Sequence, residues 1–302
     1  MKKLKIGYFA DGPWSHKAIE LIVSGKNVEI LFIVPRYDTQ DPILKNWADK
    51  LNIPYIACSD VNSDEFCDRV EVFEADLFVS MSFNQILRKR IINIPRFGFI
   101  NCHAGALPFY RGRNPLNWVL INGEEKFGIT VHKVDLGIDT GDILLQKTFE
   151  ITPLDNYGTL LDKAIVECGH ILFNALSNYH NLKPIKQDTV HPVGTYFGVR
   201  KVGDERLRFD KTSLEVFNFI RAITFPGPGA RFCIDGDEYI VWGSEMITNA
   251  PQYISTIGEV VGRNENGVVV KTQDTTILLT CISKADEIER TIPKFRIGTR
   301  LS

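Results

Sequence analysis

The sequence is poor in the features that mark several large classes of protein. Its six cysteines lie far apart and never form a C-x-x-C pair, so neither a disulfide scaffold nor a metal site is indicated. No run approaches the roughly 18 consecutive apolar residues of a membrane span. The N-terminal MKKLKIGYFADG begins like a signal peptide, but Asp11, Gly12 and Pro13 interrupt its apolar stretch. We therefore expect a reduced, cytoplasmic protein with no membrane partner and no metal.

Neither sign of charge is in excess. The chain has 35 Lys and Arg against 37 Asp and Glu, whereas nucleic-acid binders need clustered positive charge for contacts to phosphate. The basic run Arg88–Arg90 is typical of a solvated helix face. We therefore expect no nucleic-acid partner, and 302 residues that are 44% hydrophobic can bury a sizeable core.

Apolar runs alternate with amphipathic segments through the first half of the chain. Strands are predicted at residues 4–10, 28–35, 54–57, 75–82 and 98–103, with helices after Pro13 and over 43–51, 64–73 and about 115–122. This alternation is typical of an α/β, Rossmann-like, mostly parallel sheet. Residues 127–134 and 142–151 predict an antiparallel extension, and residues 157–179 predict a long helix. No G-x-G-x-x-G follows the first strand, so a dinucleotide site is not supported.

The periodicity is lost between residues 181 and 206, where Pro and Gly are scattered among polar residues. We therefore expect a larger catalytic domain over residues 1–183, a linker over 184–205 and a smaller domain over 206–302. The smaller domain has one helical segment, 213–223, and five short apolar runs. This pattern predicts a β-barrel-like (OB-like) fold.

One dense segment, residues 99–142, carries the chemistry. Asn101 and His103 lie two residues apart on a predicted strand, so both leave the same face near its carboxyl end, where open α/β sheets bind ligands. Downstream, DLGIDTGD at residues 135–142 clusters three carboxylates among two glycines, which can hold one acid in a fixed place. From spacing alone, a polar turn with an Asn cap is an open alternative.

Four linked motifs in this segment resemble the signature of the formyltransferase family that uses 10-formyltetrahydrofolate. They are N-C-H-x-x-x-L-P, Y-R-G-R-x-P-L-N-W, G-I-T-V-H and D-x-G-I-D-T-G-D-I-L. The resemblance covers the whole chain, because longer members of that family also carry a C-terminal barrel-like domain. Where many relatives read H-G-S-L-L-P, residues 103–108 read HAGALP, so the family's serine hydroxyl is absent.

The resemblance implies that Asn101, His103 and Asp139 are catalytic. The Asn101 amide can donate to the oxyanion of an acyl transfer, and His103 can accept the proton of the attacking amine or stabilise the developing charge. Asp139 would orient His103 and take up or relay a proton.

The resemblance also implies two groups of binding residues. The donor pocket, formed mostly by backbone groups, would involve Met81, Phe83, Gln85, Leu87, Ile138 and Asp142. For the acceptor, Arg111 and Arg113 supply guanidinium groups suited to a diphosphate, on a glycine-flanked turn from which they are free to reach a ligand. Tyr110 or Trp118 would stack on a base or sugar, and Asn114 completes this group. Singly, such aromatic residues more often belong to a core.

Within the family, YRGRNPLNWVLING and the later VWG most resemble enzymes that formylate nucleotide-linked amino sugars. We therefore expect transfer of a formyl group from 10-formyltetrahydrofolate to the amine of a dTDP- or UDP-amino deoxysugar. An example is dTDP-4-amino-4,6-dideoxyglucose, used for cell-surface polysaccharide such as the lipopolysaccharide O-antigen. We also expect a homodimer, whose C-terminal domain binds nucleotide, dimerises or only stabilises.

The main alternative is a methionyl-tRNA formyltransferase. Those enzymes carry a basic insertion after the second strand, whereas PRYDTQDPILKNW has one Arg and one Lys here. A third possibility is a formyltransferase-like regulator or binding module, which the intact set of Asn101, His103 and Asp139 disfavours.

Overall fold

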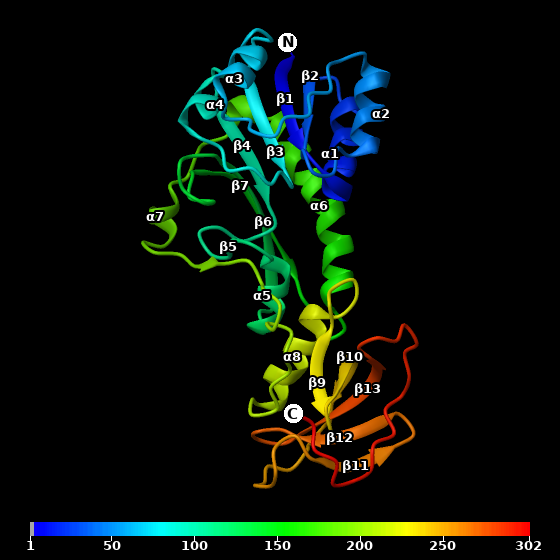
Figure 1. Ribbon diagram of the computed structural model, residues 1–302. Coiled ribbons are helices and arrows are strands. Elements are labelled where there is room, and N and C mark those ends of the chain that lie inside the picture. Colours follow the sequence, from blue (N-terminus) through cyan, green and yellow to red (C-terminus); the bar gives the residue numbers. More distant parts are fainter. Residues whose placement is uncertain (1–2) are drawn as a thin grey trace. The chain divides into compact units, whose positions relative to one another are not determined.

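The computed structural model describes residues 3–302 and divides the chain into two compact units (Figure 1). The first unit comprises the chain up to Arg113, Phe127–Phe149 and Asp162–Phe197. The second comprises Asn114–Lys126, Glu150–Leu161 and Gly198–Ser302. No helix in the described part of the chain is long and apolar enough to cross a membrane.

A six-stranded sheet forms the centre of the first unit, with the strand order β2-β1-β3-β4-β6-β7. Its strands are β1 (Leu4–Ala10), β2 (Val28–Pro35), β3 (Leu77–Met81), β4 (Phe99–His103), β6 (Lys126–Lys133) and β7 (Ile143–Glu150). The first four are parallel, and β6 is antiparallel to β4. The predicted mostly parallel sheet with an antiparallel extension is therefore confirmed.

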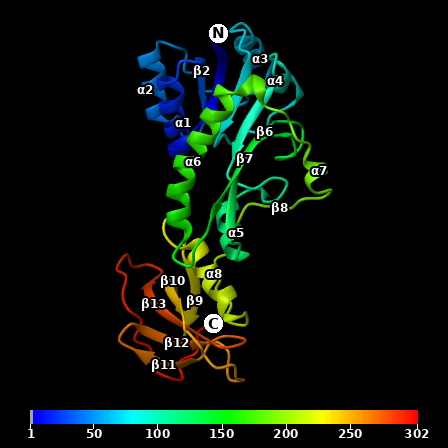
Figure 2. The same cartoon turned by 180° about the vertical axis from the view of Figure 1, so that it is seen from behind.

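Helices cover both faces of this sheet (Figures 1 and 2). One face carries α1 (Gly12–Ser24) and α6 (Tyr157–Ser177), and the other carries α3 (Asp64–Glu71) and α4 (Lys89–Asn93). α2 (Pro42–Leu51) follows β2 and begins at Asp41, whose carboxylate accepts from two backbone N–H groups of its first turn. α1 and α6 approach closely at Gly169, where an added Cβ would lie 3.0 Å from Lys17 Cγ.

Aromatic side chains fill the core on the α3 and α4 face. The Phe9 ring lies 5.2 Å from the Phe78 ring and 5.0 Å from the Phe99 ring, so three parallel strands are packed through one residue. The strand predicted at residues 54–57 is reduced to a single bridge, in which Tyr55 pairs with Ile33 of β2.

The predicted linker at 184–205 is only partly a connection. Ile185 pairs with Ile143, α7 spans Gln187–Val190, and β8 (Tyr196–Phe197) pairs in parallel with β5 (Arg111–Gly112). Residues up to Phe197 belong to the first unit, and the second unit resumes at Gly198. Much of the backbone of residues 184–197 is irregular, but hydrogen bonds anchor it within the first unit.

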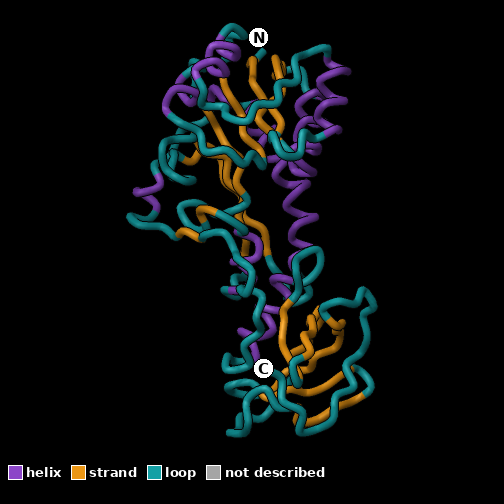
Figure 3. Tube along the Cα trace, viewed as in Figure 1, coloured by secondary structure: helices purple, strands orange, loops and turns teal. Residues whose placement is uncertain are grey.

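The second unit contains a five-stranded sheet with the order β11-β12-β13-β10-β9. The strands of both units are drawn in orange in Figure 3. Its elements are α5 (Pro115–Ile121), α8 (Ser213–Ile223), β9 (Ala230–Ile234), β10 (Asp237–Met246), β11 (Val260–Asn264), β12 (Gly267–Lys271) and β13 (Thr276–Lys284). All of its strand pairs are antiparallel.

The last residues of the chain bind both edge strands of this second sheet. Val260 N–H of β11 donates to the Thr299 carbonyl over 2.8 Å, and Cys233 N–H of β9 donates to the Ser302 carbonyl over 2.7 Å. A segment that satisfies both edges gives the sheet a barrel-like arrangement.

Candidate active site

The catalytic strand is β4, which lies between β3 and β6. Asn101 is paired with Ser80 of β3 and His132 of β6, and His103 is paired with Thr130 of β6. Directly opposite residues of neighbouring strands share a face of the sheet, so His132 accompanies Asn101. His103 closes the strand and is only 8% exposed.

The hydrogen bonds of His103 define its tautomer. Its Nε2 lies 2.7 Å from the carbonyl oxygen of Tyr110. Because a carbonyl can only accept, Nε2 carries the hydrogen and donates. The other nitrogen, Nδ1, lies 3.6 Å from Asp139 Oδ2, so in the neutral ring its lone pair faces the carboxylate and can accept a proton.

Asp139 lies on the loop between β6 and β7, with the left-handed φ of 54°. Its Oδ2 accepts from the backbone N–H of Gly112 over 2.9 Å, and its Oδ1 lies 3.4 Å from His132 Nε2. The structure therefore brings together all three predicted catalytic residues.

His132 is a member of the site that the sequence interpretation missed. Its Nδ1 donates to the Lys133 carbonyl over 2.8 Å, which leaves Nε2 to accept from Asn101 Nδ2 over 3.2 Å. His132 thus accepts one N–H of the Asn101 side-chain amide, and the second N–H remains available to another acceptor. The available signal was the alternation of Thr130 and His132 in an otherwise apolar strand, within the motif G-I-T-V-H.

Burial and neighbouring charges leave both His103 and Asp139 deprotonated at neutral pH. Burial lowers the pKa of His103, although the Asp139 carboxylate and the Tyr110 carbonyl oppose this shift. Burial would raise the pKa of Asp139, but His103, His132 and the Gly112 N–H more than offset it, and the pKa lies well below its usual range. At neutral pH the pair is therefore a neutral imidazole beside an ionised carboxylate.

The predicted donor segment, residues 81–87, is fixed by its own side chains. Phe83 packs on Phe9 with ring centroids 5.6 Å apart, and Leu87 packs on the same core. Met81, the last residue of β3, is buried. Gln85 donates to the Cys58 carbonyl and accepts from Val61 N–H. These contacts engage four side chains of the segment within the protein, whereas Ile86 is 74% exposed. The predicted part of the segment in donor binding stays a prediction.

Arg36 holds the turn of this segment. Its Nε donates to the Ser82 carbonyl over 2.6 Å, and Ser82 has a left-handed φ of 59°. Across the site, Ile138 is half exposed and Asp142 is partly buried. Their predicted part in donor binding stays a prediction.

Two predicted acceptor residues are engaged within the protein instead. The Tyr110 ring is stacked on Phe197, with centroids 5.2 Å apart and planes 10° apart, and is buried rather than presented for a ligand. Arg111 is not free to reach a ligand as predicted, because its guanidinium donates to Gln187 Oε1 and to the Val193 carbonyl. Sequence could not show this, since both partners lie far along the chain.

The remaining acceptor residues have different settings. Arg113 is exposed in the first unit. Asn114 is exposed and Trp118 is half-buried on α5, both in the second unit. Their predicted contacts to an acceptor stay predictions.

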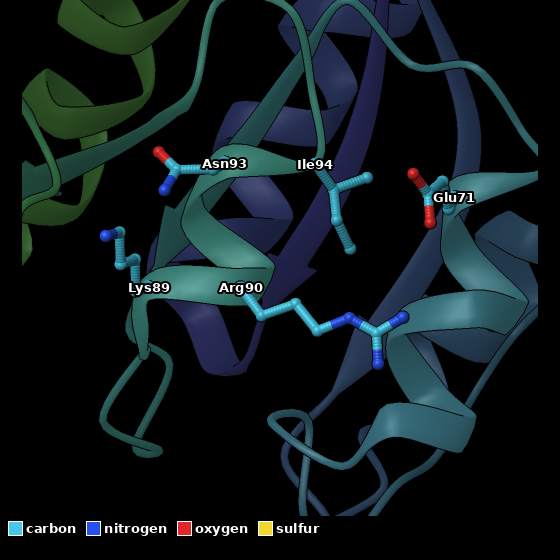
Figure 4. A pocket seen from close by; sticks show the side chains of 5 residues that line it. All are labelled: Glu71, Lys89, Arg90, Asn93 and Ile94. Carbon is cyan, nitrogen blue, oxygen red and sulfur yellow. The ribbon is translucent and has the colours of Figure 1, made fainter.

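A shallow hollow of about 500 Å³ lies away from these residues, beside α3 and α4 (Figure 4). It is lined by Glu71, Lys89, Arg90, Asn93 and Ile94. Arg90 is ion-paired with Asp64 and Asp68, so its charge is already neutralised, and we assign no ligand to the hollow. Within residues 3–302, no group of three His, Cys, Asp or Glu side chains is arranged to hold a metal ion.

An oriented amide donor, a neutral imidazole and an ionised carboxylate at the end of a parallel strand define an enzyme suited to acyl transfer. Residues 15–176 match the family model described as formyl transferase, and residues 201–299 match the formyl transferase C-terminal domain. The chain belongs to the formyl transferase family, which confirms the resemblance and the enzyme class predicted from its motifs.

Curated relatives by sequence include methionyl-tRNA formyltransferases. The protein from Bacillus velezensis is 33% identical over 240 residues, which are 79% of this chain and 74% of that protein. The protein from Macrococcus caseolyticus is 32% identical over 265 residues, 86% of this chain and 82% of that one.

Similar solved structures include sugar formyltransferases. WlaRD, a sugar 3N-formyl transferase crystallised in the presence of dTDP and 5-N-formyl-THF, has a TM-score of 0.69 at 22% identity and covers 95% of this chain and 100% of that chain. The N-formyltransferase from Helicobacter canadensis, in complex with folinic acid and dTDP-3-aminofucose, has a TM-score of 0.69 at 20% identity, with 93% and 99% coverage. At this identity the likeness shows a shared fold.

Proposed function

We propose that the protein transfers the formyl group of 10-formyltetrahydrofolate to the amino group of a nucleotide-linked amino sugar, a dTDP- or UDP-amino deoxysugar. The observation that carries the reaction is the arrangement of Asn101, His103, His132 and Asp139, with a neutral base next to an ionised acid. The geometry supports acyl transfer to a neutral amine. The choice of a sugar as acceptor rests on the chain's lack of clustered positive charge, which tRNA binding would need.

We expect the donor to bind at two segments, residues 81–87 at the end of β3 and the loop that carries Asp139. Ile86 and Ile138, 74% and 50% exposed, present apolar surface on the segments predicted to hold a pterin ring. The backbone of residues 82–87 offers polar groups beside it. When bound, 10-formyltetrahydrofolate supplies a formyl carbon activated by its N10 atom.

Each catalytic side chain then has one task. The amine nitrogen attacks the formyl carbon, and the N–H of Asn101 that His132 does not hold donates to the developing oxyanion. His103 Nδ1 takes the proton of the attacking nitrogen, and the nearby Asp139 stabilises the imidazolium that forms. As the bond from carbon to N10 breaks, His103 can return this proton to N10, which restores its neutral state.

The charge of residues 206–302, which form most of the second unit, favours a small acceptor over tRNA. Between residues 206 and 302 the chain has 12 Lys and Arg and 12 Asp and Glu, so this segment has no net charge with which to attract a polyanion. The segment after β2 likewise lacks a basic insertion. A diphosphosugar needs only a few cationic contacts.

The second candidate is methionyl-tRNA formyltransferase, which the sequence identity to curated relatives favours. The catalytic chemistry is the same for both candidates, so only the acceptor distinguishes them. The homodimer, the cytoplasmic location, and the choice of dTDP-4-amino-4,6-dideoxyglucose for O-antigen synthesis stay predictions.

The acceptor is tested by parallel assays of the candidate substrates. Purified protein is incubated with 10-formyltetrahydrofolate and, in parallel, with dTDP- and UDP-amino sugars and with charged initiator methionyl-tRNA. We expect the sugar to gain the mass of one formyl group and the tRNA to stay unmodified. His103→Asn serves as the control and should lower turnover by ~100-fold or more, the usual contribution of general acid–base catalysis. Formylation of the tRNA with no turnover of any amino sugar would establish the second candidate.

A further inference from the structure

We propose that Gln187 and Arg111 form a clamp that positions the catalytic carboxylate of Asp139, so that Arg111 serves the proton-transfer pair and not the acceptor's diphosphate. The inference rests on the proposed function, in which Asp139 assists His103. Both clamp residues belong to the first unit, as do Asp139 and His103.

Gln187 uses its whole side-chain amide in this arrangement. It is 3% exposed, and its Nε2 donates to the carbonyl oxygens of Asp139 over 2.8 Å and Gly141 over 2.7 Å. Its Oε1 accepts from Arg111 Nε over 3.0 Å and Nη2 over 2.7 Å. Two donors and two acceptor sites are therefore satisfied, and a buried amide loses stability when such partners are removed.

The backbone of Asp139 needs an external support. Its left-handed φ of 54° costs a non-glycine residue about 1–2 kcal/mol. The loop has internal bonds of its own, because Asp135 Oδ1 accepts from Gly137 N–H and Thr140 Oγ1. The Gln187 amide instead ties the loop to α7, a segment about fifty residues further along the chain.

Arg111 joins this support to the rest of the active site. Its neighbour Tyr110 accepts from His103 Nε2, and its other neighbour, Gly112, donates to Asp139 Oδ2. Through Gln187 its guanidinium also reaches the Asp139 backbone. Residues 110–112 therefore hold both members of the proton-transfer pair. They bind His103 at Nε2, and they bind Asp139 at its carboxylate directly and at its backbone through Gln187.

The segment that carries Gln187, residues 187–197, is itself paired with β5. β5 and β8 lie side by side near α7 (Figures 1 and 2), with Arg111 N–H donating to the Thr195 carbonyl over 3.1 Å. Arg111 Nη1 donates to the Val193 carbonyl over 3.2 Å. Arg111 is thus bonded to this segment through both its backbone and its side chain.

The clamp predicts a specific chemical effect. Asp139 and His132 are the titratable groups facing His103, and Asp139 is the one that favours its protonated form. Displacement of the carboxylate from its 3.6 Å separation would weaken that support without touching Nε2. The imidazolium formed during turnover would then be less stable, and kcat would fall with little change in the KM of the acceptor.

The main variants are Gln187→Met, which is close in volume, and Arg111→Lys, which keeps the charge but loses the planar fork. We expect each to lower kcat by ~10-fold or more, and the double variant to be no worse than the poorer single one, because both break the same connection. Gln187→Glu should also fail, since it can accept from Arg111 but cannot donate to two carbonyls. Lys186→Ala, at the exposed neighbouring position, is the matched control and should leave kcat unchanged.

A measurement without substrate separates this inference from the proposed function. Selective ¹³C labelling of the six histidines, with His103 assigned through the loss of its signal in His103→Asn, allows its titration to be followed by NMR. The midpoint should move to lower pH in Gln187→Met and stay in place in Lys186→Ala. If this shift is seen but the native protein formylates no amino sugar, the clamp is supported and the proposed function is rejected.

Two results would overturn the clamp. One is an unchanged His103 titration with unchanged kcat in folded Gln187→Met or Gln187→Glu protein. The other is a rise in acceptor KM alone for Arg111→Lys, with no effect of changes at Gln187, which would return Arg111 to diphosphate binding.

Discussion

His132 Nε2 accepts a hydrogen bond from Asn101 Nδ2 over 3.2 Å, across the pairing of β6 with β4. The His132 ring is itself oriented by its Nδ1 bond to the Lys133 carbonyl. Asn101 therefore presents its amide group in a fixed orientation before any substrate arrives, which is the condition for strong oxyanion stabilisation.

Replacement of His132 by Leu removes the acceptor that orients Asn101. We expect kcat to fall by ~10-fold or more while both KM values change little, because the interaction acts on charge that develops in the transition state. Asn101→Ala should cost ~100-fold or more, and the double variant should cost no more than Asn101→Ala alone. Steady-state kinetics of the three variants test this, and strictly additive losses would show that His132 acts independently of Asn101.

Asp139→Asn removes the charge that raises the proton affinity of His103. The native pKa of His103 lies below the ordinary value of about 6.5, so kcat/KM should fall only below that pH in the native enzyme. In the variant the acid limb should move to still lower pH, and kcat should drop by ~100-fold because the imidazolium loses its partner. A pH profile of kcat/KM measures both effects, and a limb that moves to higher pH would contradict this assignment of charges.

The sequence was sufficient for elements whose patterns are local. The alternation of apolar runs predicted the parallel sheet, and α8 has the predicted bounds because Thr212 and Glu215 form a capping box at its start. Asn101 and His103 stood out because they lie two residues apart at a strand end, and the family motif singled out Asp139 among the three carboxylates of residues 135–142. These features depend on neighbours in the chain.

Other features depend on partners that no local pattern encodes. His132 was hidden inside an apolar strand, and its role follows from the register of β6 with β4. Arg111 was expected to bind a ligand because a long cationic side chain on a turn has no evident partner, whereas folding brings the buried Gln187 to it from 76 residues away. The same distance explains why the segment around Gln187 was predicted as a linker.

Arg113→Ala tests the part of the acceptor prediction that survives. Unlike Arg111, this side chain is exposed at the end of the Y-R-G-R segment. A diphosphate contact made equally in ground and transition states should raise the acceptor KM and leave kcat nearly unchanged. Arg69→Ala, on the last turn of α3, is a control for loss of one positive charge. Equal KM values for native protein and Arg113→Ala would remove Arg113 from the acceptor site.

Gly105→Ala tests the bond between His103 and Tyr110 by steric intrusion. An added Cβ would lie 2.6 Å from His103 Nε2 and 2.7 Å from the Tyr110 carbonyl oxygen, so it would wedge apart the two atoms that fix the tautomer. The backbone at this position is not left-handed, so the effect is one of space alone.

For Gly105→Ala we expect a loss of about 1–3 kcal/mol in the free energy of unfolding, as for other overpacked sites, and a lower kcat as the imidazole shifts. Gly198→Ala is the matched control, since an added Cβ there meets nothing within 4 Å. Chemical denaturation and steady-state kinetics provide the two measurements. Native kcat in Gly105→Ala would mean that the Nε2 bond to Tyr110 is not what holds the base in its reactive orientation.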